Sequence, residues 1–344
     1  MIMSDKKRSE VEDKLKARTA AADIRRYAPA QMSFWPEERR AIANELARSA
    51  IFHCGNSRKP RVMYDNASLF MLGGGAMTYT GEELRGKDED LFMTLAHCAR
   101  EKPSGELVVQ VTSSQICKLN KWQQDQRYYD EIFRSVQRLK GGIITVFSKR
   151  LTKAIKCQKA LEQGASPEEL ARLYDELTEF ERREALDLGI EHDGEEISGM
   201  MVSLISGTPI FTGAKSLKDN IPQGNLTWTI PMDKNMVALF AKPYLTHVDF
   251  EDRHSLSATG KRLQAYFLSH KNPHPVKLSS LAKMLNLHYA DPAALKYNLN
   301  AEFDDLKALG LIEFKYEKTA DNKEWKVAVT RRYKDKPTGT AQID

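Results

Sequence analysis

Apolar side chains recur at helical spacing between residues 126 and 140. The spacing follows the i, i+3, i+4, i+7 rule of a helix buried along one stripe, and the stripe consists of Tyr129, Ile132, Phe133, Val136 and Leu139. The Gly141-Gly142 pair that follows predicts the end of the helix, because glycine adopts a left-handed cap at little cost. Residues 143–147 then predict a strand.

The other face of this predicted helix is polar, and glutamine and arginine crowd toward its first turns. Arginine pairs with guanine and glutamine with adenine on the base edges of a major groove, so the pattern indicates contact with DNA. The candidate DNA-binding residues are Lys121, Gln123, Gln124, Gln126, Arg127, Tyr128 and Arg134. Arg127 is the strongest of them because it lies in the first turn. The competing interpretation is a surface ion pair of Arg127 with Asp130 or Glu131.

The same pattern occurs a second time near the C-terminus. Another apolar stripe closes at Gly310 and consists of Leu295, Leu299, Phe303, Leu306 and Leu309. Two strands are predicted after it, at 311–316 and 325–330, and form a hairpin. The exposed candidates at the start of this helix, where asparagine could pair with adenine, are Lys296, Tyr297, Asn298 and Asn300. For Asn298 and Asn300 the alternative is an ordinary exposed polar position.

Two shorter helical patterns precede each copy, at 89–100 and 113–120 and at 257–270 and 278–286. A recognition helix that follows shorter helices and leads into a wing of strands is typical of a winged helix. We therefore expect an α+β fold of two tandem winged-helix domains, at 36–250 and 251–335, with a flexible basic arm at 1–35 and a tail at 336–344. Basic residues beside the expected wings suit phosphate contacts: Lys149, Arg150, Lys153, Lys315, Lys318 and Arg331.

An acidic insertion interrupts the first expected wing at 151–196, and its part at 161–196 holds thirteen Asp/Glu against three Lys/Arg. Ser166-Pro167-Glu168-Glu169 predicts a capped helix start after a helix at 151–163, and hence an αα-hairpin. DNA would repel its acidic face, so we assign the insertion to protein contacts or spacing. The recognition segment differs, because residues 118–153 hold nine Lys/Arg against three Asp/Glu.

The remaining elements are expected to be short. Pro36 predicts the start of a helix that runs to about His53, and residues 61–84 predict strands around a Gly73-Gly74-Gly75 turn. A strand is predicted at 107–111. After the insertion the sheet is expected to resume at 200–206, 209–211, 226–230 and 236–240.

Composition narrows the class of protein. The chain of 344 residues and net charge +5 lacks an apolar run of membrane-spanning length and the hydrophobic region of a signal peptide, and its four scattered cysteines suit reduced thiols in a cytoplasm. It contains no Gly-x-x-x-x-Gly-Lys-Ser/Thr loop and no His-x-His pair beside Tyr128 or Tyr129. We therefore expect no catalysis, no metal and no cofactor, although His247, Asp249, Asp252 and His254 could be drawn as a metal cluster.

Several strings, in order, resemble the TrfA-type replication initiators of broad-host-range bacterial plasmids. They are Ala47-Arg48-Ser49-Ala50-Ile51-Phe52, Thr78-Tyr79-Thr80-Gly81-Glu82-Glu83-Leu84-Arg85, Arg127-Tyr128-Tyr129, Val237-Ala238-Leu239-Phe240-Ala241 and the helix at 256–270. The resemblance implies binding as a monomer to directly repeated duplex sequences called iterons, with a dimer inactive in initiation. It also implies melting of a neighbouring AT-rich element, which could leave single-stranded DNA to bind, and recruitment of the host helicase and sliding clamp.

One string departs from the family pattern. Relatives carry a Gln-Leu-Ser-Leu-Phe-like string that fits the clamp pocket, whereas here the string is shorter and consists of Gln31, Met32, Ser33 and Phe34 before Trp35-Pro36. The alternative is a hydrophobic staple, with Phe34 or Trp35 packed inward. For the whole chain the alternative function is a winged-helix transcriptional repressor of its own operon, and a third interpretation makes one winged helix only a dimer or partner surface.

Overall fold

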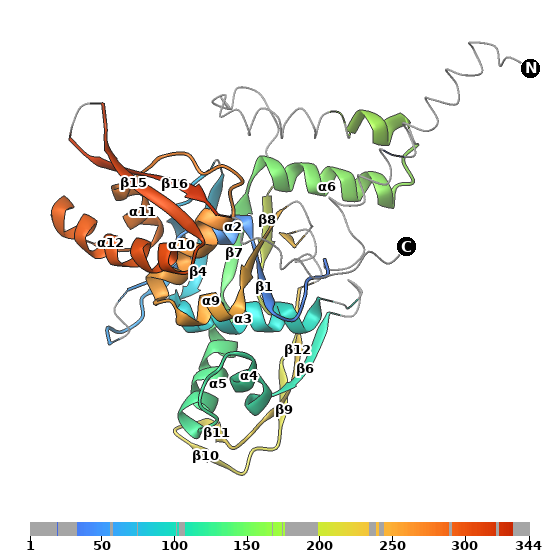
Figure 1. Ribbon diagram of the computed structural model, residues 1–344. Helices are drawn as coiled ribbons and strands as arrows, with labels where there is room; N and C mark the ends of the chain where they lie inside the picture. Colours follow the sequence, from blue (N-terminus) through green and yellow to red (C-terminus); the bar gives the residue numbers. More distant parts are fainter. Residues whose placement is uncertain are drawn as a thin grey trace, which may run out of the picture.

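The computed structural model mixes helices with small antiparallel sheets around two hydrophobic cores (Figure 1). It describes residues 19, 33–55, 58–73, 75–100, 102, 107–166, 168–173, 175, 199–233, 239–240, 244–288, 291–320 and 323–332, with the backbone alone at 149, 150, 153, 154 and 158. The larger core draws on residues between Trp35 and Ala265. The smaller core lies between Leu256 and Val329.

The first elements form strands rather than the helix expected from Pro36 to His53. β1 (Arg39–Ala43) pairs with β13 (Leu245–Asp249), a short helix α2 (Asn44–Ala47) follows, and β2 (Phe52–His53) pairs in parallel with β5 (Leu84–Arg85). Residues 40–43 are all buried, so both faces of the segment find partners. A helix would leave β13 without its partner, and this long-range pairing overrides the local pattern.

A four-stranded antiparallel sheet has the strand order β3-β4-β7-β8. The hairpin expected around Gly73 is confirmed as β3 (Met63–Leu69) and β4 (Ala76–Glu82). β7 (Ile143–Phe147) pairs with β4 on one side and with β8 (Gly199–Val202) on the other. The predicted strand at 236–240 is wrong where it is described, because Leu239 and Phe240 lie in a helical turn.

Beside this sheet lies the first of two similar units, and it carries the first predicted recognition helix. Its helices are α3 (Gly86–Ala99), α4 (Ser113–Leu119) and α5 (Gln126–Gly141). Its sheet has the strand order β6-β12-β9, formed by β6 (Val108–Thr112), β12 (Thr227–Pro231) and β9 (Ile210–Thr212). We call these six elements the first unit. A small hairpin, β10 (Ser216–Lys218) and β11 (Ile221–Gln223), lies between β9 and β12 in the chain.

The C-terminal region repeats this plan and is called the second unit. It runs through α10 (Ala258–Leu268), β14 (Val276–Lys277), α11 (Leu278–Met284), α12 (Pro292–Ala308), β15 (Ile312–Lys318) and β16 (Trp325–Arg331). Its strand order is β14-β16-β15. Gly310 has φ +68°, so the predicted left-handed end of this helix is confirmed. α9 (Phe250–Ser255) connects β13 to this unit.

Buried ion pairs join α3 of the first unit to the segment that enters the second. The Glu89 carboxylate accepts hydrogen bonds from Arg262 at 2.7 Å and lies 2.9 Å from the Arg253 guanidinium. Lys261 pairs with Asp90 at 2.6 Å. Arg262 also donates to the carbonyl oxygens of Leu46, Ala47 and Ser49. Because Glu89 and Arg262 are almost wholly buried, these contacts hold the two units in one arrangement.

The insertion follows β7, and a single residue, Ser148, separates that strand from α6. α6 (Lys149–Glu162) confirms its first predicted helix, and hydrogen bonds between Ser166 and Glu169 confirm the capping box. Residues 176–196, which would complete the second predicted helix, lie outside the described residues. Among the described helices, none is long and apolar enough to cross a membrane.

Candidate nucleic-acid interface

The start of α5 presents a group of polar side chains to solvent. Asp125 caps the helix by accepting a hydrogen bond from the Tyr128 amide at 3.0 Å. Gln123 and Gln124 lie exposed in the turn before the helix, and Arg127 and Arg134 lie exposed seven residues apart on it. Seven residues are close to two helical turns, so the two arginines share one face.

The competing ion pair of Arg127 is absent from the described residues. Asp130 accepts a hydrogen bond from Gln126 at 2.6 Å, and Glu131 pairs with Arg138 at 2.6 Å. Both carboxylates are therefore engaged by other side chains. Arg127 keeps its guanidinium available to an external anion or a base edge.

Three other candidates on this segment have partners within the protein. Gln126 accepts a hydrogen bond from the Gly224 amide at 2.9 Å, besides donating to Asp130. The Tyr128 ring stacks on Trp122 at 5.8 Å, with the Lys87 ammonium over its other side. Lys121 forms an ion pair with Glu251. These side chains shape the helix start. Gln123, Gln124, Arg127 and Arg134 form its exposed surface, although Gln124 also accepts a hydrogen bond from the Ser114 hydroxyl.

The hairpin of the first unit is not the one predicted. We expected β7 to begin a wing with its partner beyond the insertion, and β7 does pair with β8. That pair belongs to the other sheet, however, because β6 pairs with β12, and β12 with β9. The hairpin equivalent to β15–β16 is therefore β9–β12. Lys149, Arg150 and Lys153 consequently lie in α6 rather than beside the hairpin of the first unit.

Sequence reasoning also missed two lysines at the end of this hairpin. Lys215 and Lys218 are exposed and form no ion pair with any residue in the described ranges. The β10–β11 hairpin that carries Lys218 turns at Asp219 and Asn220, with φ values of 51° and 63°. The Asp-Asn pair is a known turn signal for positive φ at both central residues. That dipeptide, between two short runs, was the signal that could have revealed the hairpin.

The exposed candidates of α12 make more contacts with their own unit. The Lys296 ammonium lies 3.7 Å from the centre of the Trp325 ring, Asn298 donates to the Ala294 carbonyl, and Asn300 donates to Asp304. Tyr297 is 81% exposed and, of these four, alone makes no polar or ring contact with the described residues. The Asn residues thus fit the plainer interpretation of exposed polar positions.

The basic candidates on the second hairpin also have partners. Lys315 pairs with Glu317 at 2.6 Å, and the Lys318 ammonium lies 4.2 Å from the centre of the Trp325 ring. Arg331 donates to the His270 carbonyl at 2.8 Å. Lys315, Lys318 and Arg331 are thus all engaged within the protein, whereas Arg127 and Arg134 of α5 have no ion-pair partner among the described residues.

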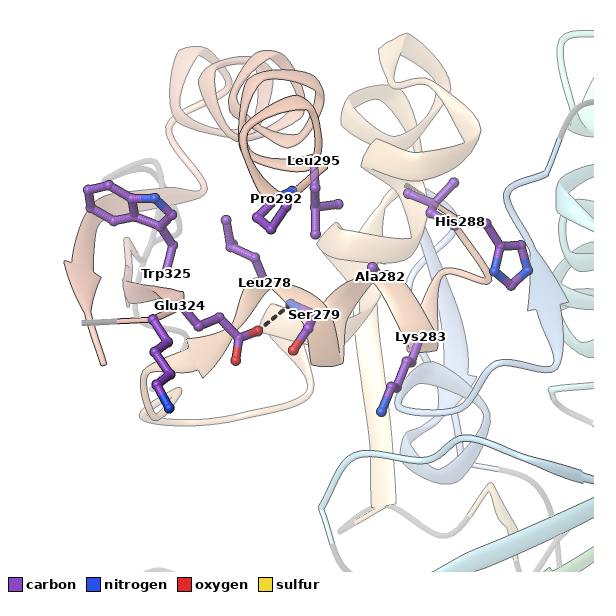
Figure 2. Close-up of a pocket in the computed structure, with 11 residues that line it drawn as sticks. Leu278, Ser279, Ala282, Lys283, His288, Pro292, Leu295, Glu324 and Trp325 are labelled. Carbon is purple, nitrogen blue, oxygen red and sulfur yellow. Dashed lines mark hydrogen bonds between the residues drawn. The ribbon is translucent and has the colours of Figure 1, made fainter. Parts of the chain in front are cut away.

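A hollow of about 860 Å³ separates α11 and the first turn of α12 from the start of β16 (Figure 2). Its walls are largely apolar and include Leu278, Ala282, Pro292, Leu295 and Trp325. Lys283, His288 and Lys323 add basic groups to its lining.

One carboxylate occupies this hollow. Glu324 accepts a hydrogen bond from the Ser279 amide at 3.1 Å and lies 3.5 Å from the Lys277 ammonium. Burial alone would raise the pKa of Glu324, but the hydrogen bonds from Ser279 and the contact with Lys277 lower it. Glu324 thus stays ionised and offsets some of the positive charge of the lining.

The string considered for clamp binding is only partly described. Gln31 and Met32 lie outside the described residues. The Ser33 hydroxyl donates to the Phe240 carbonyl at 3.1 Å, and Phe34 is 66% exposed. Trp35 is buried and donates through Nε1 to Nδ1 of His97 at 3.0 Å. Trp35 therefore packs inward, as the hydrophobic-staple alternative expects, and Phe34 lies on the surface.

The fold is shared with a solved structure. Domains 2 and 3 of RctB superpose on this chain with a TM-score of 0.50 at 10% identity, over 83% of this chain and 98% of that one. A second RctB structure of domains 2–3, residues 155–483, gives a TM-score of 0.45 at 12% identity over 81% of this chain and 94% of that one. The first likeness shows that this chain shares the mixed helix-and-sheet fold of RctB domains 2 and 3.

Sequence comparison adds the family. The family model described as TrfA protein matches residues 6–161 and 223–322. The chain therefore belongs to the TrfA family. It is 25% identical over 281 residues, 81% of its length, to the "Plasmid replication initiator protein TrfA" of Escherichia coli. The chain spans 59% of that relative's length.

Proposed function

We propose that this protein initiates plasmid replication by binding directly repeated duplex sequences at an origin. The observation that carries the proposal is the repeat of one plan in the two units. Each has helix, strand, two helices and two further strands, with the first strand paired to the last. This repeated plan supports a winged-helix assignment for both units, and the third helix of a winged helix enters a major groove.

The two third helices, α5 and α12, would enter major grooves about one helical turn apart. Two unequal helices in one chain suit an asymmetric repeat, whereas a symmetric dimer of one unit would suit a palindrome. α5 would contribute Arg127 and Arg134 for bases or phosphates, with Gln123 and Gln124 at its start. On α12, Tyr297 is the most available side chain. Family membership supports the same function, because the E. coli relative is named a replication initiator.

Replication would require further partners. We propose that residues 36–250 and 251–335 form the two DNA-binding domains, and that the chain binds iterons as a monomer in exchange with a dimer. Host helicase and sliding clamp would then join the opened origin. The exposed side chain of Phe34 supports the clamp contact, since an apolar side chain free of the core could enter a pocket on the clamp.

The function is tested by selecting bound duplexes from a random pool. We expect one asymmetric motif of about two helical turns, roughly 20 base pairs. Affinity for the motif should fall with salt at a log–log slope of about −0.9 per phosphate neutralised. A short palindrome would indicate a dimeric repressor instead. Failure to enrich any duplex would exclude sequence-specific binding.

The clamp contact is tested separately with purified sliding clamp. Phe34→Ala and Gln31→Ala should both weaken binding while leaving thermal stability unchanged. Arg39→Ala provides a control, since Arg39 is exposed nearby but lies in β1. The absence of binding by the unaltered protein would exclude the clamp as a partner.

A further inference from the structure

The β10–β11 hairpin has one strand packed on α5 and one strand in solvent. Ile221 and Pro222 of β11 are buried, whereas all three residues of β10 are exposed. The hairpin lies next to α5 (Figure 1). Hydrogen bonds tie the base of the hairpin to α5, from Gly224 to Gln126 at 2.9 Å and from Gln223 to Asp130 at 3.4 Å. The hairpin is therefore held in a fixed position beside the exposed arginines of α5.

Leu217 stands at the middle of the exposed strand, and 71% of its surface is open to solvent. A single exposed leucine is ordinary on a protein surface. Here, however, Lys215 and Lys218 flank it, and both ammonium groups lack an ion-pair partner among the described residues. Asp219 adds one negative charge at the turn, so the tip keeps a net positive charge.

This combination fits one kind of ligand, the minor groove of duplex DNA. Proteins that kink DNA insert an apolar wedge between base steps and hold the neighbouring phosphates with basic residues. Flexible pyrimidine–purine steps, such as TA, deform at the lowest cost. Leucine is long enough to separate adjacent base pairs, and lysines on either side can reach the two phosphate strands.

We propose that Leu217 inserts into the minor groove next to the segment contacted by α5 and kinks the duplex there. This inference rests on the proposed DNA binding and adds a deformation step to it. Unstacking at the kink would favour separation of the strands at that step. The family match covers residues 6–161 and 223–322, so Lys215, Leu217 and Lys218 all lie between its two segments.

The experiment uses the full chain and a duplex obtained by selection, labelled at both ends for energy transfer. A bend in the range of about 20–90° is expected for the unaltered protein. Leu217→Ala should remove most of the bend, while Leu217→Phe should retain it because phenylalanine also serves as a wedge. The fluorescence of 2-aminopurine placed at successive steps should rise at one step only, and this rise should be lost in Leu217→Ala.

Two controls separate the wedge from general binding. Ile210→Ala removes an apolar side chain that is 57% exposed on β9, in the three-stranded sheet of the first unit rather than in the β10–β11 hairpin, and it should leave the bend unchanged. Lys215→Ala and Lys218→Ala should each reduce the salt slope by about one phosphate contact. An equal bend in Leu217→Ala and the unaltered protein, or binding with a straight duplex, would overturn the inference while leaving the proposed function intact. The absence of any DNA binding would overturn both.

Discussion

Arg262 on α10 donates a hydrogen bond of 2.7 Å to the carboxylate of Glu89 on α3, and the two residues lie 173 positions apart in the chain. Both side chains are at most 1% exposed. The pair links the second unit to the larger core, and Arg253 completes the charge balance around Glu89. The relative position of α5 and α12 therefore depends on a charge pair that water does not reach.

Removing one member of this pair should be costly. Glu89→Gln leaves the guanidinium groups of Arg262 and Arg253 without their full partner, and we expect a loss of about 3–5 kcal/mol in the free energy of unfolding. Urea denaturation measures the loss. Asp175→Asn is a suitable control, because it also removes one carboxylate charge but lies exposed in the insertion. Equal urea midpoints for Glu89→Gln and Asp175→Asn would contradict a structural role for the Glu89–Arg262 pair.

Gly142 and its neighbour Gly141 should respond to alanine in opposite directions. A Cβ at Gly142 would lie 2.6 Å from the Tyr79 hydroxyl oxygen and 2.8 Å from its ring, whereas a Cβ at Gly141 would meet nothing within 4 Å. We expect Gly142→Ala to cost about 1–3 kcal/mol through overpacking. Gly141→Ala should stabilise the end of α5 by about 0.5–1 kcal/mol. Thermal unfolding of the two variants checks the sign of each change.

Arg127→Ala should weaken DNA binding by about 1–3 kcal/mol and relax the preference at one base pair of the selected motif. The reason is that its guanidinium has no competing carboxylate in the described residues. Arg172→Ala removes the same charge from an exposed position in the insertion, and it should leave the motif and affinity unchanged. Titration of each variant against the selected duplex provides the measurement, and equal affinities would exclude a role for Arg127.

His97 should make the protein less stable below neutral pH. Its Nδ1 accepts a hydrogen bond from Trp35, and its Nε2 donates to Glu37 at 2.9 Å, an arrangement that requires the neutral ring. Burial, with help from the Arg40 and Arg100 guanidinium groups, lowers the pKa of His97 despite the opposing effect of Glu37. The unfolded chain then binds a proton that the folded protein does not, so stability falls as pH drops below about 6.5.

The same direction holds for His53, whose pKa is lowered chiefly by burial. Unfolding should therefore be measured between neutral and mildly acidic pH for three proteins. His97→Gln should weaken the dependence of the free energy of unfolding on pH without abolishing it, because His53 still contributes. His274→Gln, at an exposed position, should follow the unaltered protein. If the free energy of unfolding of His97→Gln depends on pH as steeply as that of the unaltered protein, His97 does not cause the loss of stability at mildly acidic pH.

The helices α5 and α12 could be predicted from sequence because their apolar stripes are local. Tyr129 to Leu139 and Leu295 to Leu309 each set one buried face within a single helix, and turn signals follow both stripes. The end of α5 was predicted at the right place for the wrong reason. Gly142 has an extended backbone with φ −85°, and glycine is required there by the close approach of Tyr79.

The hairpin of the first unit could not be predicted in the same way. Its strand β12 pairs with β6, and Trp228 donates to the Ser113 hydroxyl from 115 positions away. The insertion and the β7–β8 pair lie between β6 and β12 in the chain. β7 is the first strand after α5 and was therefore predicted as the wing, although it belongs to another sheet. The burial of charged residues such as Glu89 and Arg262 could not be predicted, because residues of these types usually lie on the surface.

The pairing of β1 with β13 limits how the chain can be cut or synthesised. Arg39 lies opposite Asp249, so the first strand acquires its neighbour only after about 200 further residues have left the ribosome. Until then the segment keeps an open edge of unpaired amides and carbonyls, which is a site for aggregation. A fragment that ends before Asp249 carries the same defect permanently. A fragment that is to contain a paired β1 must therefore extend at least through Asp249, and folding of this segment on the ribosome should wait for that residue.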